Sequence, residues 1–161
     1  MHQIRVANPE DAGVILQLIK DLALYEKEPE KVVCTVDDIL RDSFSEPKRF
    51  DCLLAECDGH AVGFAVYYYK WSTWTGTRTL HLEDLFVKPV YRGRKIGFDL
   101  LQRLAKIAVD EKCDRFEWDV LDWNKLALDF YTSIGAVVKE GWLTCRMDGN
   151  ALIELANVKR D

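Results

Sequence analysis

Leu80-His81-Leu82-Glu83-Asp84-Leu85-Phe86-Val87 leads into the turn Val90-Tyr91-Arg92-Gly93-Arg94-Lys95-Ile96-Gly97, and these two stretches decide the fold. The first predicts a strand, and the leucine spacing after Phe98 predicts a helix to about Lys112. A strand, a glycine turn and a helix start in this order direct free backbone N–H groups and the positive end of a helix dipole at one point. Four cations gather there: Lys88, Arg92, Arg94 and Lys95. The sequence therefore predicts an anion-binding turn.

The composition of the chain sets the wider expectations. Its 161 residues, 48% apolar and 30% charged, predict a single compact domain over residues 1–161. The start of the chain has no apolar signal core and no apolar run is long enough to span a membrane, so we expect a cytoplasmic protein. The net charge of -5 argues against nucleic-acid binding and suits a small cationic ligand. Five scattered cysteines lack the close pairs of a zinc site, so we expect no metal.

Outward from the opening stretch, hydrophobic periodicity predicts alternating elements along the whole chain. Expected strands cover residues 4–6, 52–57, 62–69, 80–87, 116–121, 142–147 and 151–155. Expected helices follow a cap at Asn8, start at Thr35, run from Phe98 to Lys112, and cover 124–133 with Gly135 at the end. Residues 58–60 are a hairpin turn in this scheme, residues 71–79 a connection, and Asp148-Gly149-Asn150 the last turn.

Residues 92–98 match neither G-x-G-x-x-G nor the Walker pattern G-x-x-x-x-G-K-[ST], which removes support for hydride transfer and nucleotide hydrolysis. A solvated surface loop stays open as an alternative. The turn resembles the acetyl-CoA loop of the GNAT N-acetyltransferases, [Arg/Gln]-x-x-Gly-x-[Gly/Ala]: Arg92 and Gly97 match its ends, and Lys95 stands where the family usually has its middle glycine. A lysine there narrows the turn but adds a charge beside a pyrophosphate.

The resemblance covers nearly the entire chain. The segments that carry it are 25–26, Trp74, 82–87, 91–93, 123–124, 130–131, 135–136 and 140–142, which look like the diamine acetyltransferase branch of the family. It implies an α/β (α+β) fold with one mixed, mostly antiparallel twisted sheet flanked by about four helices, acetyl-CoA as co-substrate, and a homodimer. By similarity, the cofactor-binding residues are Leu85, Phe86, Val87, Arg92, Gly93, Arg94, Lys95, Ile96, Gly97, Phe98, Asn124, Lys125, Leu126, Ala127 and Tyr131.

Acetyl transfer to an amine needs a base, because an alkylammonium with a pKa near 10.4 is neutral in only about one part in 10³ at pH 7.4. Glu83, flanked by Leu82 and Leu85, is the candidate base, although an edge-strand glutamate facing solvent fits the same pattern. Backbone N–H groups of residues 85–87 are implied by the resemblance as the oxyanion donors. Tyr131 is the implied acid for the leaving thiolate, with a core aromatic as the alternative.

The acceptor is expected to be a small primary amine. By similarity, its binding residues are Tyr25, Glu26, Ser72, Trp74, Glu83, Asp84, Glu117, Trp118, Asp119, Leu121 and Glu140. Asp84 faces away from Glu83 by strand alternation unless the strand bulges. Ser72 stands where the polyamine enzymes have an aspartate, and Leu121 stands where they have a smaller residue. In these two positions the chain resembles the thialysine N-epsilon-acetyltransferases instead. Polyamines, protein lysines and a non-catalytic acyl-CoA-binding module stay as alternatives.

Overall fold

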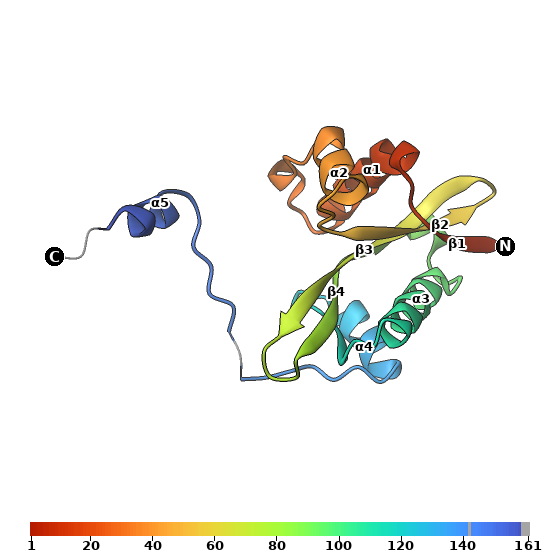
Figure 1. Cartoon of the computed structure of the whole chain (residues 1–161). Helices are drawn as coiled ribbons and strands as arrows, with labels where there is room; N and C mark the ends of the chain where they lie inside the picture. The colour runs from red at the N-terminus through yellow and green to blue at the C-terminus, as the bar shows by residue number, and fades with distance from the viewer. Residues whose placement is uncertain (142, 159–161) are drawn as a thin grey trace. The chain divides into compact units, whose positions relative to one another are not determined.

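Five strands form one mixed sheet in the order β1-β2-β3-β4-β5; Figure 1 labels the first four of them. The computed structural model describes residues 1–141 and 143–158, in two units, Met1–Asp119 and Val120–Asp161. The strands, all in the first unit, are β1 His2–Val6, β2 Asp51–Cys57, β3 His60–Ser72, β4 Thr77–Val87 and β5 Arg115–Trp118. Neighbouring strands are antiparallel from β1 to β4, and β4 pairs with β5 in parallel. The expected mixed, mostly antiparallel sheet is thus confirmed.

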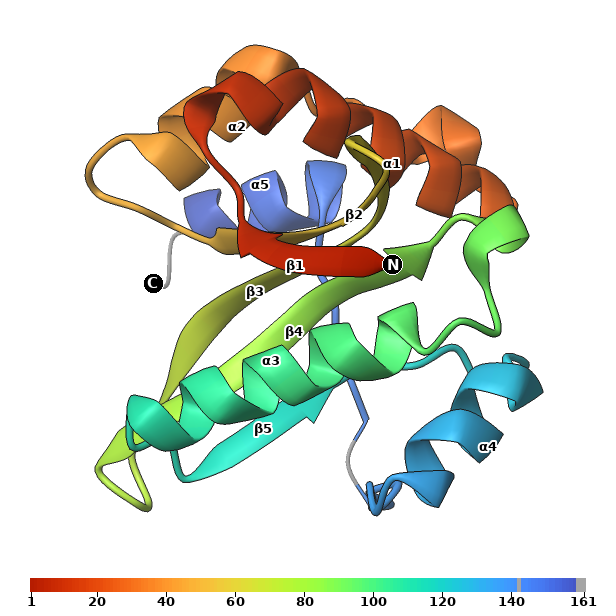
Figure 2. The same cartoon turned by 90° about the vertical axis from the view of Figure 1, so that its right-hand side faces the viewer.

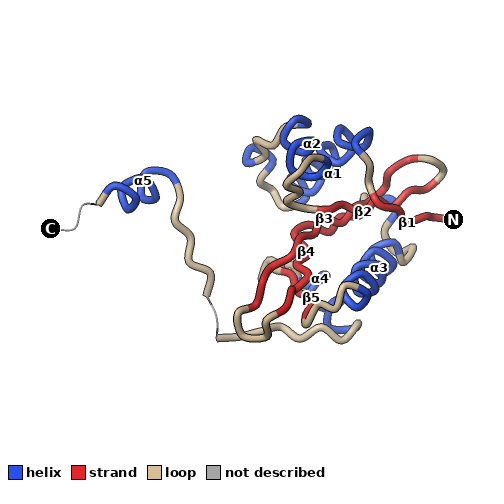
Figure 3. Tube along the Cα trace, viewed as in Figure 1, coloured by secondary structure: helices blue, strands red, loops and turns tan. Residues whose placement is uncertain are grey.

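The described helices are divided between the two units (Figure 3). They are α1 Ala12–Tyr25, α2 Val36–Phe44 and α3 Ile96–Asp110 in the first unit, and α4 Lys125–Ser133 and α5 Gly149–Asn157 in the second. Short 3-10 turns cover Pro9–Asp11, Pro29–Lys31 and Pro89–Tyr91. The predicted caps are confirmed at Asn8 and Thr35, whose side chains accept hydrogen bonds from the first-turn N–H groups of Glu10 and Asp38.

The two faces of the sheet carry different helices (Figure 2). On one face, α1 and α2 bury a cluster built around Ile15, Leu18, Ile39 and Phe64. On the other, α3 packs on the strands through Leu100, Leu101 and Leu104 among others. Each large aliphatic or aromatic side chain buried in this way contributes about 1.5–3 kcal/mol. The two cores hold β4 rigidly between them, which matters for the site that it carries.

The hairpins show where sequence patterns were sufficient and where they were not. A turn was predicted over residues 58–60; Asp58 and Gly59, with φ values of 50° and 77°, form it between β2 and β3, and His60 is already the first residue of β3. The predicted connection over residues 71–79 is too long, because β3 continues to Ser72 and β4 starts at Thr77. Cross-strand pairs explain the extension: Trp71 pairs with Arg78, whose guanidinium lies 4.8 Å from the ring centroid of Tyr69.

Three predictions for the last third of the chain are corrected. The strand expected over 116–121 ends at Trp118, because the β4–β5 ladder stops where β4 becomes irregular. Residues 143–147 are not in a strand, and position 142 lies outside the described residues. Residues 151–155 lie in α5, not in a strand: Ala151, Leu152, Glu154 and Leu155 are good helix formers, and Asp148 is the N-cap instead of a hairpin residue.

Candidate active site

β4 contains one residue more than β3 can pair with, and that residue is Glu83. Tyr67 pairs with Leu82 and Val66 with Asp84, so Glu83 is a β-bulge between the two pairs. Strand alternation places Glu83 on the same face as His81. Because Glu83 is an extra residue, Asp84 pairs with Val66 and lies on this face as well. The bulge that Asp84 needs in order to share a face with Glu83 is therefore present, and it brings both carboxylates to the face that α1 and α2 cover.

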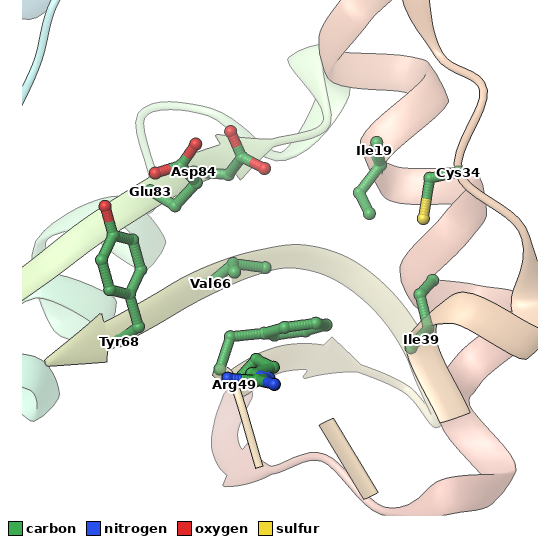
Figure 4. A pocket seen from close by; sticks show the side chains of 9 residues that line it. Ile19, Cys34, Ile39, Arg49, Val66, Tyr68, Glu83 and Asp84 are labelled. Atoms are coloured by element: carbon green, nitrogen blue, oxygen red, sulfur yellow. The ribbon is translucent and has the colours of Figure 1, made fainter. Parts of the chain in front are cut away.

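These carboxylates line a pocket with a volume of about 470 Å³. The lining residues are Ile19, Cys34, Ile39, Arg49, Phe50, Val66, Tyr68, Glu83 and Asp84. Figure 4 shows the Glu83 and Asp84 carboxyl groups side by side at one end, with Arg49 on the other side of Val66. The volume lies within the range of about 300–1,000 Å³ typical of small-molecule pockets.

Asp84 is the electrostatically unusual group of the pocket. Burial raises its pKa from 3.8 to about 7, and the nearby charges of Glu83 and Glu26 act in the same direction. Glu26, just past the end of α1, also has a raised pKa, mainly because it is partly buried. Glu83 is 55% exposed at its side chain and stays accessible to a ligand. Three carboxylates that repel one another favour a bound cation.

His81 lies beside this group and was not anticipated as a site residue. It is 4% exposed, and among the described residues its Nδ1 atom has no hydrogen-bond partner. Its Nε2 is 3.8 Å from Glu83 Oε2 and its Nδ1 is 3.9 Å from Glu117 Oε1, both beyond hydrogen-bond length. Burial lowers its pKa, and Lys70 adds to this, so this environment favours the neutral ring beside the acidic pocket.

Beyond Leu82, β4 has no strand partner on its β5 side among the described residues. The Lys88 N–H donates to Val62 O across the β3 side at 2.9 Å. Since N–H groups alternate along a strand, those of Val87 and Leu85 point to the open side. The open edge therefore offers backbone donors next to the acidic pocket, in the segment expected to stabilise an oxyanion.

The glycine turn follows this open edge directly. Gly93 has a φ of 76°, and Lys95, with a φ of 65°, is the left-handed N-cap of α3. Arg92 Nε donates to Val87 O at 3.0 Å, and its guanidinium lies 4.6 Å from the Tyr25 ring centroid. Arg94 lies over the Tyr91 ring at 5.2 Å. Exposed cations around the start of a fifteen-residue helix form a donor set that fits a pyrophosphate.

Several expected acceptor residues lie elsewhere in the first unit. Ser72 and Trp74 are at the tip of the β3–β4 hairpin, where Ser72 Oγ accepts from Thr75 N at 3.3 Å and Trp74 is 88% exposed. Ser72 pairs with Thr77, six residues or about 20 Å of strand from Glu83. Trp118 pairs with Leu82 and so lies on the opposite face. The structure brings neither Ser72, Trp74 nor Trp118 to the pocket.

The remaining predicted residues belong to the second unit and are described within it. Asn124 caps α4, its side chain accepting from Ala127 N at 3.2 Å. Gly135, with a φ of 94°, ends the helix: its N–H and that of Ala136 donate to Thr132 O and Tyr131 O, a Schellman motif. Burial raises the pKa of the Tyr131 phenol. Lys125, Leu126, Leu121 and Glu140 are also in this unit and exposed.

Comparisons with known proteins agree with this architecture. Residues 16–136 match the acetyltransferase (GNAT) family. The chain is 42% identical to the thialysine N-epsilon-acetyltransferase of Sus scrofa (95% of this chain, 96% of the relative). It is 38% identical to the spermidine/spermine N(1)-acetyltransferase-like protein 1 of Homo sapiens (96% of this chain, 24% of the relative). An integron cassette protein from the V. cholerae mobile metagenome superposes with a TM-score of 0.83 at 27% identity, covering 98% of both chains.

The fold and these relationships define an N-acetyltransferase, and the chain belongs to the GNAT acetyltransferase family. Members of that family use acetyl-CoA as co-substrate. No group of three or more His, Cys, Asp or Glu side chains suited to a metal ion occurs in the described part of the chain. Within those same residues, no helix is long and apolar enough to cross a membrane.

Sequence analysis missed most of the pocket wall. Ile19 belonged to the apolar stripe of a predicted helix, Ile39 lay within the next predicted helix, and Val66 and Tyr68 lay in a predicted strand, with nothing to mark them as pocket residues. Arg49 had no signal at all, because it lies in an irregular loop that the fold alone carries to the pocket.

Proposed function

We propose that this enzyme transfers the acetyl group of acetyl-CoA to the side-chain amine of thialysine and related lysine-like amino acids. The observation that carries the proposal is the bulge at Glu83, which joins two carboxylates in one pocket beside the open edge of β4. The carboxylates suit an ammonium group, and the wall of Ile19, Ile39 and Val66 suits a thioether or methylene chain. The relatedness to a thialysine N-epsilon-acetyltransferase supports the same choice of acceptor.

Removing the proton from the acceptor ammonium is the first chemical task. At pH 7.4, forming the free amine from an ammonium group with a pKa near 10.4 costs about 4 kcal/mol. In this proposal Glu83 takes the proton, directly or through water, because it is the exposed member of the pair. Asp84, with a pKa of about 7, changes its charge near neutral pH and tunes how strongly the pocket holds the ammonium.

The co-substrate supplies an activated acetyl thioester. The glycine turn, with Arg92, Arg94 and Lys95, would hold its pyrophosphate at the start of α3. The Leu85 and Val87 N–H groups would stabilise the negative charge that develops on the thioester oxygen.

Tyr131 would protonate the leaving thiolate of CoA. The variant Tyr131→Phe should then lower kcat more than it lowers the affinity for acetyl-CoA, and undiminished turnover would contradict this role.

We also propose, from the length and composition of the chain, that residues 1–161 form a single N-acetyltransferase domain that acts in the cytoplasm, and, from the family resemblance, that it forms a homodimer. Light scattering of the purified protein tests the oligomeric part. A molecular mass of one chain at micromolar concentration would contradict it.

A linear polyamine is the second candidate, because Glu26, Glu83 and Asp84 together form an acidic surface that attracts polycations. An acceptor screen decides between the two. Rates of CoA release are measured with thialysine, lysine, spermidine and putrescine at equal acetyl-CoA concentration. We expect the highest kcat/KM for thialysine, whose amine is more acidic than that of lysine; a higher value for spermidine would overturn the proposal.

A further inference from the structure

Arg49 is the one cationic residue among those that line the acidic pocket. It follows α2 in the loop that leads to β2, and its backbone N–H donates to Asp42 O at 2.7 Å. The next N–H, of Phe50, reaches the same oxygen at 3.4 Å. These two bonds fix the loop against the end of α2, so the position of Arg49 beside the pocket is set by the fold.

The Arg49 guanidinium forms no hydrogen bond or ion pair with any residue that the structure describes. The carboxylate whose pKa it helps to lower is Asp42, but Arg41 is the main cause and already occupies that carboxylate, with contacts of 2.6 and 3.1 Å. The neighbouring Lys48, by contrast, is paired with Asp51 at 2.6 Å. Arg49 therefore has its donors available to a ligand.

The pocket is thus polar at both ends with opposite signs. Figure 4 shows Glu83 and Asp84 on one side of Val66 and Arg49 on the other. Phe50, Ile39 and Val66 supply the apolar surface of the same cavity. A guanidinium is planar and presents paired N–H donors that match a carboxylate.

We infer that Arg49 binds the α-carboxylate of the acceptor, so that the pocket selects amino acids with a side-chain primary amine over linear polyamines. The inference rests on the proposed function and adds the carboxylate donor that the acceptor requires. A lysine-like amino acid places an ammonium at the acidic end and a carboxylate at the basic end. A polyamine places a second cation near Arg49, and like charges repel.

A matched pair of substrates tests this assignment. Thialysine and bis(2-aminoethyl) sulfide share the thioether and both amines and differ only in the α-carboxylate. For the wild type, we expect kcat/KM to be about tenfold to a hundredfold higher for thialysine, the range for one charge-assisted pair. Arg49→Gln should remove most of this preference by raising KM for thialysine, while kcat/KM for the diamine rises because a repelling cation is gone.

Lys48→Gln is the control, since it removes the same charge from the adjacent position outside the pocket. It should keep the preference of the wild type. Arg49→Lys should keep part of the preference for thialysine, because lysine keeps the positive charge but lacks the paired N–H donors of the guanidinium. If Arg49→Gln keeps the full preference, or if the wild type does not distinguish the two substrates, the inference is wrong while the amine acetyltransferase activity stands. If no amine supports CoA release, the proposed function itself fails.

Discussion

At the scale of single residues, the inserted Glu83 has the largest consequence. If Glu83 were paired in register and the strand did not bulge, Asp84 would point to the α3 side of the sheet and the pocket would hold one carboxylate instead of two. The identities of Glu83 and Asp84 as candidates followed from the sequence, because a resemblance and a need for acidic groups pointed to them. The bulge did not, since a one-residue irregularity leaves no mark on the hydrophobic pattern.

Asp84 also makes stability depend on pH. Its pKa is raised in the folded protein, so the folded state binds more protons than the unfolded state between about pH 4 and pH 7, and stability falls as pH rises through that window. Between pH 5 and pH 8, the wild type should lose about 2 kcal/mol more unfolding free energy than Asp84→Asn, which is most of the roughly 2.6 kcal/mol that the shift allows over this range. Urea unfolding at the two pH values measures this.

Asp58→Asn provides the matched control, because Asp58 is an exposed turn residue with a positive φ that asparagine also adopts. It should reproduce the pH dependence of the wild type. Equal losses for the wild type and Asp84→Asn would show that Asp84 is not the group responsible.

At the scale of elements, the junction between β4 and α3 combines an open strand edge with a strained cap. Lys95 adopts a left-handed conformation that costs a residue with a Cβ atom about 1–2 kcal/mol. Lys95 is the departure from the family loop in the sequence, and in the structure this lysine takes a conformation that glycine adopts freely. The lysine therefore adds strain and charge to the turn, and α3 still starts directly after it, at Ile96.

Lys95→Gly should raise the unfolding free energy by about 0.5–1 kcal/mol, since relief of the strain exceeds the extra chain entropy of glycine. It should also weaken acetyl-CoA binding if the ammonium contacts the pyrophosphate. Denaturant unfolding and calorimetric titration measure the two effects. Arg94→Gly, at a neighbour without a positive φ, should not stabilise the protein; stabilisation by both variants would contradict the assignment of strain to Lys95.

Elements were predictable where local signals agreed. The caps at Asn8 and Thr35 and the turn within residues 58–60 each depend on contacts within a few residues, and each was found as expected. Residues 151–155 show the opposite case: their apolar spacing is compatible with either a strand or a helix, and local propensity favoured the helix α5.

At the scale of the whole molecule, the first unit carries the two carboxylates of the pocket, the open edge of β4 and the glycine turn on consecutive parts of one chain segment. The sheet sets this arrangement, because β4 lies between two cores and cannot shift without disturbing both. The family resemblance predicted this architecture from the sequence. The opposite charges at the two ends of the pocket were not predictable, since Arg49 joins it through the packing of a loop.

The position of the transferred acetyl group on thialysine tests the central claim most directly. The purified enzyme is incubated with thialysine and acetyl-CoA, and the product is analysed by tandem mass spectrometry and NMR. With the side-chain amine at Glu83 and Asp84 and the α-carboxylate at Arg49, the acetyl group should be on the side-chain nitrogen, with one CoA released per product. Acetylation of the α-nitrogen, or no acetylated product at all, would contradict the account.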